Sequence, residues 1–390
     1  MKDNKTPIKG RIINTFKGTL GFTLISIVFG LIVGAIALKI AGFSPIEAYK
    51  VIFDGVFGRP KYISYTIVYA TPLIITGLSV SFAFRTGLFN IGAEGQFIVG
   101  SLVAAAVGLF WDLPIVLHAI VAILLGALAA GLWGAIAGYL KSRFGVHEVI
   151  ATIMLNWIAL YLNNYFIMFE GFKRPQGETT MDIQQSASIG ILEKWKYSKA
   201  GREWLKDSPI LRDIFGSPVN LGIIIAIILA VIVWYILKKT TLGYELRAVG
   251  FNKYAAEYGG INVKKSMVTS MFIAGALSGI AGTIQVLGVN KHVSVLAAME
   301  GYGFDGIGVA LIGGNTAIGS VLGALLFGGL KYGGSKLNYA LRAPSEIVSI
   351  VIGTIVFFVA IPKFIKWIGK PLNNITKYSR RKRGEENGNE

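Results

Sequence analysis

The stretch GLFNIGAEGQFIVG, residues 87–100, lies between two long apolar runs and yet carries Asn90, Glu94 and Gln96. A charged side chain at membrane depth costs roughly 2.5–3.5 kcal/mol on insertion scales. The glycines on either side of Glu94 can break a helix, and a broken helix offers free backbone amides to a carboxylate. We therefore expect a glycine-broken membrane helix in which Glu94 either holds backbone amides or borders a solute path.

The composition places the chain in a membrane. Its 390 residues are 53% hydrophobic and only 15% charged, whereas soluble domains are usually about 25% charged. The apolar residues come in blocks of roughly 20, the length that a helix needs to cross a bilayer. We predict an all-α fold, a polytopic transmembrane helical bundle of about ten membrane segments. The expected segments are 20–40, 63–84, 88–110, 114–139, 147–169, 219–237, 264–288, 303–315, 317–333 and 345–367, of which the short eighth and ninth could form a re-entrant pair.

Charge orients this bundle. The formal net charge is +17, and the basic residues gather at both chain ends and in short loops, as they do in cytoplasmic segments under the positive-inside rule. Both termini are therefore expected in the cytoplasm, and no nucleic-acid partner is needed to explain the charge. The predicted organisation is a cytoplasmic segment 1–19, a transmembrane domain 20–368 and a basic cytoplasmic tail 369–390, with an extracellular loop 170–218 and a cytoplasmic loop 239–263.

Patterns for catalysis and metal binding are missing from the sequence. There is no Walker A loop, and GYGFDG (301–306), which matches a dinucleotide-binding fingerprint, follows no predicted strand. The three histidines are scattered, and there are no cysteines. We therefore expect no catalytic residue, no metal site and no cofactor in this chain.

Polar residues recur inside the predicted spans. In the fifth span Glu148, Thr152, Asn156 and Asn163 share one helical face. They could line a wet path for a neutral solute, or they could join helices through hydrogen bonds worth about 0.6 kcal/mol each. A cap on the eighth span is an equal alternative for Asp305. Both interpretations stay open for the candidate path residues, which are Asn90, Glu94, Gln96, Asn156, Asn163, Gln285, Asp305 and Asn315.

The predicted cytoplasmic loop contains NKYAAEYGG (252–260), which is punctuated like a short helix. Asn252 is a good N-cap, and Gly259 suits the C′ position, where φ is often positive. A short helix on the cytoplasmic face favours a docking element for a partner, and we expect Ala256 on its contact surface. The candidate docking residues are Asn252, Lys253, Tyr254, Ala255, Ala256, Glu257, Tyr258 and Gly259.

Four stretches together resemble the permease subunits of ATP-binding-cassette (ABC) importers, in the branch that serves simple sugars and nucleosides. They are FRTGLFNIGAEGQFIVG (84–100), GVHEVIATIMLNWIALYL (145–162), GYELRAVGFNKYAAEYGGINV (243–263) and FDGIGVALIGGNTAIGSVLGA (304–324). The NIGAEGQ form is more similar to the nucleoside members than to the ribose-type permeases.

The resemblance implies a multi-pass protein of the bacterial plasma membrane, without an ATPase site of its own. The third stretch would form a coupling helix that docks on a separate ATPase subunit, which uses ATP and Mg²⁺. The other implied partners are a second homologous permease, an extracellular solute-binding lipoprotein, membrane lipids and a nucleoside substrate.

Two other functions stay open at this point. One is a permease for a simple sugar of the ribose or galactose type. The other, less favoured, is an ion-coupled secondary transporter, which usually depends on ionisable residues embedded in the membrane. Few ionisable residues lie inside the predicted spans of this chain.

Overall fold

The computed structural model describes residues 19–360 of the chain. The predictions for residues 1–18 and 361–390, which include most of the N-terminal segment and the basic tail, lie outside the described residues. Over the described range the ordered elements are helices, and extended backbone makes isolated bridges only. The all-α prediction is therefore confirmed for this part of the chain.

The described residues divide into two compact units, one made of residues 19–49 and 341–360 and the other of residues 50–340. In the first unit α2 (Thr19–Ile40) packs along α17 (Ser345–Ala360). The Thr354 hydroxyl donates to the Gly30 carbonyl at 3.2 Å and joins these two helices. Helix α3 (Pro45–Phe57) begins in this unit and follows α2 after a bend of 119°.

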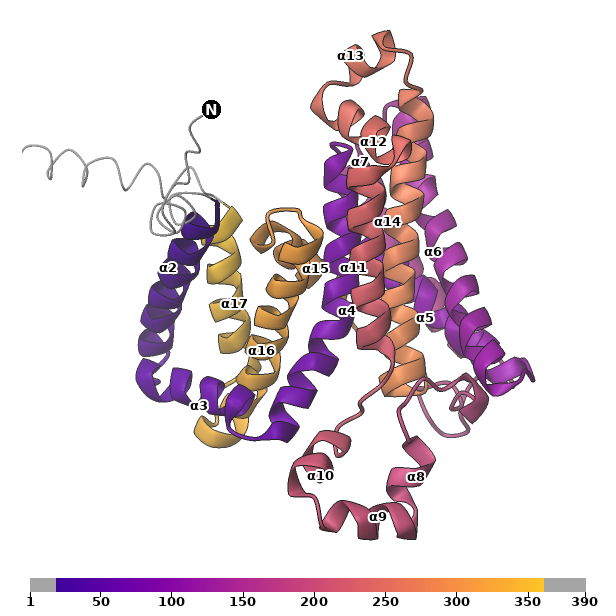
Figure 1. Cartoon of the computed structure of the whole chain (residues 1–390). Helices are drawn as coiled ribbons and strands as arrows, with labels where there is room; N and C mark the ends of the chain where they lie inside the picture. The colour runs from indigo at the N-terminus through magenta and orange to yellow at the C-terminus, as the bar shows by residue number, and fades with distance from the viewer. Residues whose placement is uncertain (1–18, 361–390) are drawn as a thin grey trace, which may run out of the picture. The chain divides into compact units, whose positions relative to one another are not determined.

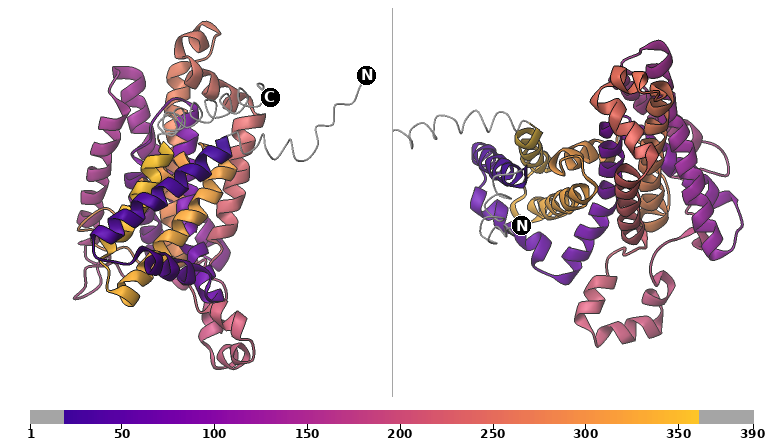
Figure 2. Two further views of the ribbon diagram at one scale, coloured as in Figure 1. Left: turned by 90° about the vertical axis from the view of Figure 1, so that its left-hand side faces the viewer. Right: turned by 45° about the horizontal axis from the view of Figure 1, so that its top comes forward.

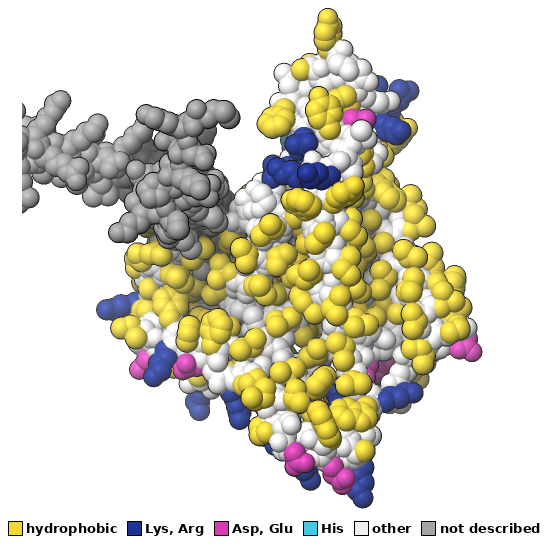
Figure 3. Space-filling view, in the orientation of Figure 1, with side chains coloured by type: hydrophobic (Ala, Val, Ile, Leu, Met, Phe, Trp, Pro, Cys, Tyr) yellow, Lys and Arg dark blue, Asp and Glu magenta, His cyan; other side chains and the backbone are white. Residues whose placement is uncertain are grey.

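The second unit is a bundle around two central helices (Figures 1 and 2). Most of α4 and α14 is buried, whereas less than a third of α6 and α11 is, so the latter two present apolar faces that suit lipid. Figure 3 shows these faces as part of a broad apolar belt. The helices of the bundle are α4 (Pro60–Arg85), α5 (Ala93–Phe110), α6 (Ile115–Phe144), α7 (Glu148–Ile167), α11 (Gly222–Lys239), α14 (Val263–Gln285) with its π-helical extension η2 (Val286–Asn290), α15 (Tyr302–Ile312) and α16 (Ala317–Leu341).

Small residues allow the central helices to touch through their backbones. A Cβ atom added to Gly100 of α5 would lie 2.5 Å from the Cα of Gly279 in α14. One added to Gly134 of α6 would lie 2.5 Å from the Met271 carbonyl oxygen of α14. Membrane helices associate by close packing rather than by hydrophobic burial, so these contacts hold α14 between α5 and α6.

The number of full spans is smaller than predicted. Among residues 19–360 seven helices are long and apolar enough to cross a membrane, or eight if α2 and α3 together form one bent span. Helix α15 has 11 residues, and at 1.5 Å per residue it is too short to cross a bilayer about 30 Å thick. Helix α16 continues to Leu341, beyond the predicted end at 333, and is long enough to span. The two are therefore a half-length helix and a full one, and not a pair of short segments.

The two connecting regions lie at opposite ends of the second unit (Figure 1). One end carries η1 (Gln185–Ala187), α8 (Glu193–Tyr197), α9 (Lys199–Lys206) and α10 (Pro209–Phe215). The other end carries α12 (Thr241–Phe251) and α13 (Lys253–Tyr258). Between the apolar belt and α13, Figure 3 shows a group of Lys and Arg side chains.

Candidate functional site

The buried carboxylate of Glu94 joins the beginnings of two helices. Its two oxygens accept hydrogen bonds from the backbone amides of Gly301, at 2.7 Å, and Gly303, at 2.6 Å. These amides lie at the N-terminus of α15, where backbone donors lack intrahelical partners and the helix dipole favours a negative charge. These hydrogen bonds offset part of the cost of burying Glu94, through a helix distant in sequence rather than through its own.

Asn90 and Gln96 form a reciprocal amide pair. Asn90 Nδ2 donates to Gln96 Oε1 at 2.8 Å, and Gln96 Nε2 donates back to Asn90 Oδ1 at 3.1 Å. Asn90 Nδ2 also reaches Ser79 Oγ at 3.2 Å, and that hydroxyl donates to the Ala274 carbonyl and accepts from Ser278. The pair therefore links α4, α5 and α14 in a network that is closed to solvent.

The polar face predicted for the fifth span is the buried face of α7. Asn156 Oδ1 accepts from the Gly95 amide at 2.8 Å, and Asn156 Nδ2 donates to the Ile91 carbonyl at 3.0 Å. Asn163 Nδ2 donates to the Ser294 carbonyl at 3.1 Å, while its Oδ1 is buried without a hydrogen-bond partner. Glu148, at the start of this face, forms an ion pair with Lys141. These side chains fasten α7 to the broken start of α5 and to the segment after η2.

The remaining candidate path residues lie apart from this network. Gln285 donates to Asn290 one turn later. Asn315 stands in the turn between α15 and α16 with φ of 53°, and its carbonyl accepts two hydrogen bonds from Arg85. Asp305 forms an ion pair with Lys331 of α16. The structure thus brings Asn90, Gln96 and Asn156 together around α5 and does not bring Gln285 or Asn315 to them; a contact of any of the eight with substrate stays a prediction.

Four tyrosines form a set that the sequence reasoning missed, here called the tyrosine row: Tyr62, Tyr65 and Tyr69 of α4 with Tyr332 of α16. The rings of Tyr65 and Tyr332 are stacked, with centroids 5.0 Å apart and planes 5° apart. Tyr62 and Tyr69 contact the same Tyr332 ring at 6.0 and 5.7 Å. The spacing of 62, 65 and 69 puts three aromatic rings on one helical face, a signal that could have found them.

Tyr302 continues the aromatic surface toward the Asp305–Lys331 pair. Its ring stacks on Phe97 at 5.1 Å, and the Lys331 ammonium lies 5.3 Å from its centroid. Lys331 also pairs with Asp305, so a carboxylate and an ammonium both lie beside the Tyr302 ring. Tyr69 is 37% exposed, and Tyr302 is half-buried. A planar solute could therefore stack here and find both a carboxylate and an ammonium for hydrogen bonding.

A cavity of about 280 Å³ opens at the α8–α10 end, and Tyr65 is part of its wall. Lys291 crosses this wall and donates to Ser188 Oγ at 2.7 Å, with its ammonium 3.1 Å from the Glu193 carboxylate. Burial by itself raises the pKa of Glu193, but the Ser188 hydrogen bond and the nearby lysine charges outweigh it and lower that pKa below its ordinary value. Since Tyr65 borders both features, the cavity leads directly to the tyrosine row.

The predicted short helix is present as α13. The Asn252 side chain accepts from the amides of Tyr254 and Ala255, at 3.0 and 3.1 Å, so the N-cap prediction is confirmed. The C-terminal prediction is wrong by one residue: Gly259 has φ of −76°, and Gly260 has φ of +84°. The reason is that the helix makes its last α-helical hydrogen bond at Gly259, to Ala255, and the chain reverses only after it.

The contact surface of α13 also differs from the prediction. Ala256 is only 5% exposed, so it packs inward instead of facing a partner. The side chains that project from this end are Tyr254, 71% exposed, and Tyr258, 97% exposed, with Phe251 at the end of α12, 90% exposed. A six-residue helix has room for one inward position, and Ala256 takes it.

Comparison with known proteins agrees with this architecture. Residues 62–360 match the family described as the permease component of branched-chain amino acid transport systems. The chain is 45% identical over 346 residues to the guanosine ABC transporter permease NupP of Bacillus subtilis, an alignment that covers 88% of this chain and 94% of the relative. It is 37% identical to the nucleoside ABC transporter permease NupB of Lactococcus lactis, over 93% of this chain and 96% of the relative.

A second guanosine ABC transporter permease of Bacillus subtilis, NupQ, is 32% identical over 67% of this chain and 78% of the relative. No solved structure shows significant similarity to the chain.

Proposed function

Because this chain belongs to the permease family of ABC transport systems, we propose that it forms part of the path by which an importer takes up nucleosides. The observation that carries this proposal is the aromatic surface formed by the tyrosine row and Tyr302, beside the Asp305–Lys331 ion pair. It lies on α4, α15 and α16 in a membrane bundle, and it begins at a cavity that opens at one end.

The chemistry of a nucleoside fits this surface. A planar base stacks on aromatic side chains with a gain of about 1–3 kcal/mol per base, and every base has such a face. The ribose hydroxyls can donate to the Asp305 carboxylate, and Lys331 can donate to ring or carbonyl acceptors of the base. The Asp305–Lys331 ion pair carries no net charge, and it therefore suits an uncharged solute.

Uptake measurements test this assignment. In cells that produce the whole transporter, Tyr69→Ala and Tyr302→Ala should each lower the uptake of labelled guanosine about tenfold, as expected for a lost stacking partner. Tyr69→Phe keeps the ring and should retain most uptake. Tyr161→Ala, at a 65% exposed position of α7, is the matched control and should behave like the unaltered protein.

Three results would contradict the proposal. Normal guanosine uptake by both alanine variants would remove the aromatic surface from the path. Competition by ribose, with none by guanosine or uridine, would assign the permease to simple sugars instead. An uptake driven by an ion gradient in the absence of any ATPase would favour a secondary transporter.

We also propose that α13 docks on a separate ATPase subunit, which binds ATP and Mg²⁺. The exposed rings of Phe251, Tyr254 and Tyr258 support this, because large apolar side chains at the end of a projecting element suit a protein contact. The α13 end then faces the cytoplasm, in accord with the positive-inside rule. The α8–α10 end faces outward, where an extracellular solute-binding lipoprotein would deliver the nucleoside.

The second permease is proposed to be a homologous chain, so that two coupling helices serve two ATPase subunits. The similarity of this chain to both NupP and NupQ supports a paired arrangement. Co-purification of the chain with a related permease and an ATPase subunit is the expected result. A chain that transports guanosine when reconstituted alone would contradict it.

A further inference from the structure

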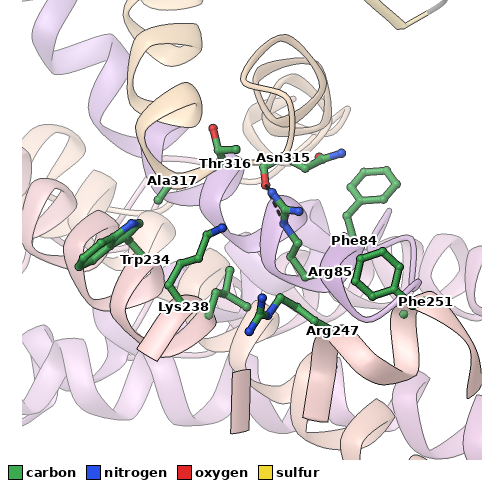
Figure 4. Close-up of a pocket in the computed structure, with 11 residues that line it drawn as sticks. Phe84, Arg85, Trp234, Lys238, Arg247, Phe251, Asn315, Thr316 and Ala317 are labelled. Atoms are coloured by element: carbon green, nitrogen blue, oxygen red, sulfur yellow. Dashed lines mark hydrogen bonds between the residues drawn. The ribbon is translucent and has the colours of Figure 1, made fainter. Parts of the chain in front are cut away.

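A cavity of about 320 Å³ lies at the α12 end of the bundle, away from the aromatic surface described above. It is bounded by the ends of α4 and α11, by α12 and by the turn between α15 and α16. In Figure 4 the side chains of Arg85, Lys238 and Arg247 converge on it from three different elements. Phe84, Trp234 and Phe251 form its aromatic walls.

The positive charge of this cavity is uncompensated within the described part of the chain. Neither an aspartate nor a glutamate lines it, and none of the three cations has an ion pair there. Arg85 donates through Nε and Nη2 to the Asn315 carbonyl, at 3.0 and 2.6 Å, and Arg247 donates through Nε to the Gly243 carbonyl at 3.1 Å. Other guanidinium donors and the Lys238 ammonium remain for a ligand.

One wall of the cavity is continuous with a lipid-facing surface. Trp234 is 42% exposed and lies on α11, where Ile227, Ile228 and Val231 are also exposed. Tryptophan at this level is typical of the boundary between hydrocarbon and headgroups. A ligand in the cavity can therefore place an anionic group among the cations and an apolar tail along α11.

We propose that this cavity binds the phosphate headgroup of an acidic phospholipid, with its acyl chains on α11. Arginine and lysine side chains that converge between membrane helices are suited to lipid phosphates. Since Arg247, Gly250 and Phe251 belong to α12, the lipid would touch the element that carries α13. The bound lipid would hold α12 against the ends of α4 and α11.

Native mass spectrometry of the purified permease tests the site. Dioleoylphosphatidylglycerol should be retained in preference to dioleoylphosphatidylcholine. Lys238→Gln and Arg247→Gln should each weaken this retention about fivefold, since each removes one positive charge from the cavity wall that faces the headgroup. Lys239→Gln is the matched control, because it removes the neighbouring charge of the same helical turn, which does not line the cavity.

A folding defect is separated from a binding defect by the thermal stability of the variants in neutral detergent without added lipid, which should equal that of the unaltered protein. Added phosphatidylglycerol should then raise the melting temperature of the unaltered protein and of Lys239→Gln, but not that of a protein carrying both Lys238→Gln and Arg247→Gln. Equal retention of the two lipids, an equal loss in Lys239→Gln, or full displacement of phosphatidylglycerol by millimolar inorganic phosphate would each overturn the proposal.

Discussion

The carboxylate of Glu94 at the start of α5 accepts a hydrogen bond from the backbone amide of Gly303 at the start of α15, 209 residues later in the chain. The two helix beginnings are so close that a Cβ atom added to Gly303 would lie 2.2 Å from the Glu94 amide nitrogen. A single buried side chain thereby fixes where the half-length helix α15 begins, and with it the positions of Tyr302 and Asp305.

Replacing the Glu94 carboxylate should destabilise the permease. In Glu94→Gln one of the two amides, that of Gly301 or that of Gly303, faces an NH2 group instead of an acceptor oxygen, a loss of about 1–3 kcal/mol. Glu94→Ala should lose more because both donors stay buried. The melting temperature of the purified protein measures this, with the exposed Glu203→Gln as control. An unaltered melting temperature together with abolished uptake would mean that Glu94 acts on the substrate instead.

The Asn90–Gln96 pair should behave as one unit. A double-mutant cycle with Asn90→Ala and Gln96→Ala should give a coupling free energy of about 1 kcal/mol, because either single change leaves the other buried amide unpaired. The free energies come from denaturant unfolding of the detergent-solubilised protein. Additive effects of the two changes would show that the amides do not depend on each other.

Arginine substitutions at two adjacent alanines of α13 should have different effects. Ala255→Arg changes an exposed position, so the protein should fold normally but lose uptake and co-purification of the ATPase. Ala256→Arg forces a charge into a buried position, so the amount of folded protein should itself decrease. Fluorescence-detected size exclusion separates the two outcomes. Normal transport and ATPase association in a folded Ala255→Arg variant would remove α13 as the coupling element.

The two glycines after α13 should also differ. Gly260 has φ of +84°, so Gly260→Val should cost about 1–3 kcal/mol in backbone strain and disturb docking. Gly259 has an ordinary φ of −76°, and Gly259→Ala should be nearly neutral. Gly260→Ala adds the same methyl group as Gly259→Ala, so the two variants can be compared directly. Uptake by the two alanine variants is the comparison, and equal loss in both would contradict the assignment of the reversal to Gly260.

Acid should loosen the segment that carries α8 to α10. The pKa of Glu193 is lowered from its ordinary value of 4.5, so the ionised group stabilises the fold above that pH. Its contribution is lost as the pH falls below about 4.5 and the carboxylate is protonated, which breaks its contact with Lys291. Pepsin cleavage between residues 188 and 217 should therefore accelerate in this range. In Glu193→Gln cleavage should be fast already at pH 5, and an unchanged pH profile in this variant would exclude Glu193 as the cause.

The sequence alone was sufficient for several features that depend on neighbours along the chain. Apolar blocks of helical length predicted the membrane bundle, and the Asn252 cap predicted the start of α13, because a cap bonds amides two and three residues away. The end of the same helix was placed one residue early, because the sequence does not show which residue makes the last hydrogen bond of a helix. Within residues 19–360 there are seven spans, or eight with the bent pair, and the sequence suggested ten. The short α15 accounts for one of the missing spans, and the predicted last span, 345–367, extends beyond the described residues.

Only the tertiary structure decided which distant groups meet. The sequence offered backbone amides or a solute path as alternatives for Glu94, but did not show that α15 supplies the amides. The helical spacing of three tyrosines on α4 was present in the sequence but was missed, and nothing in it places Tyr332 of α16 among them. The convergence of Arg85, Lys238 and Arg247 likewise follows from the packing of three elements. The physical reason is that helical periodicity fixes the direction of a side chain on its own helix, whereas its partner depends on how the helices pack across hundreds of residues.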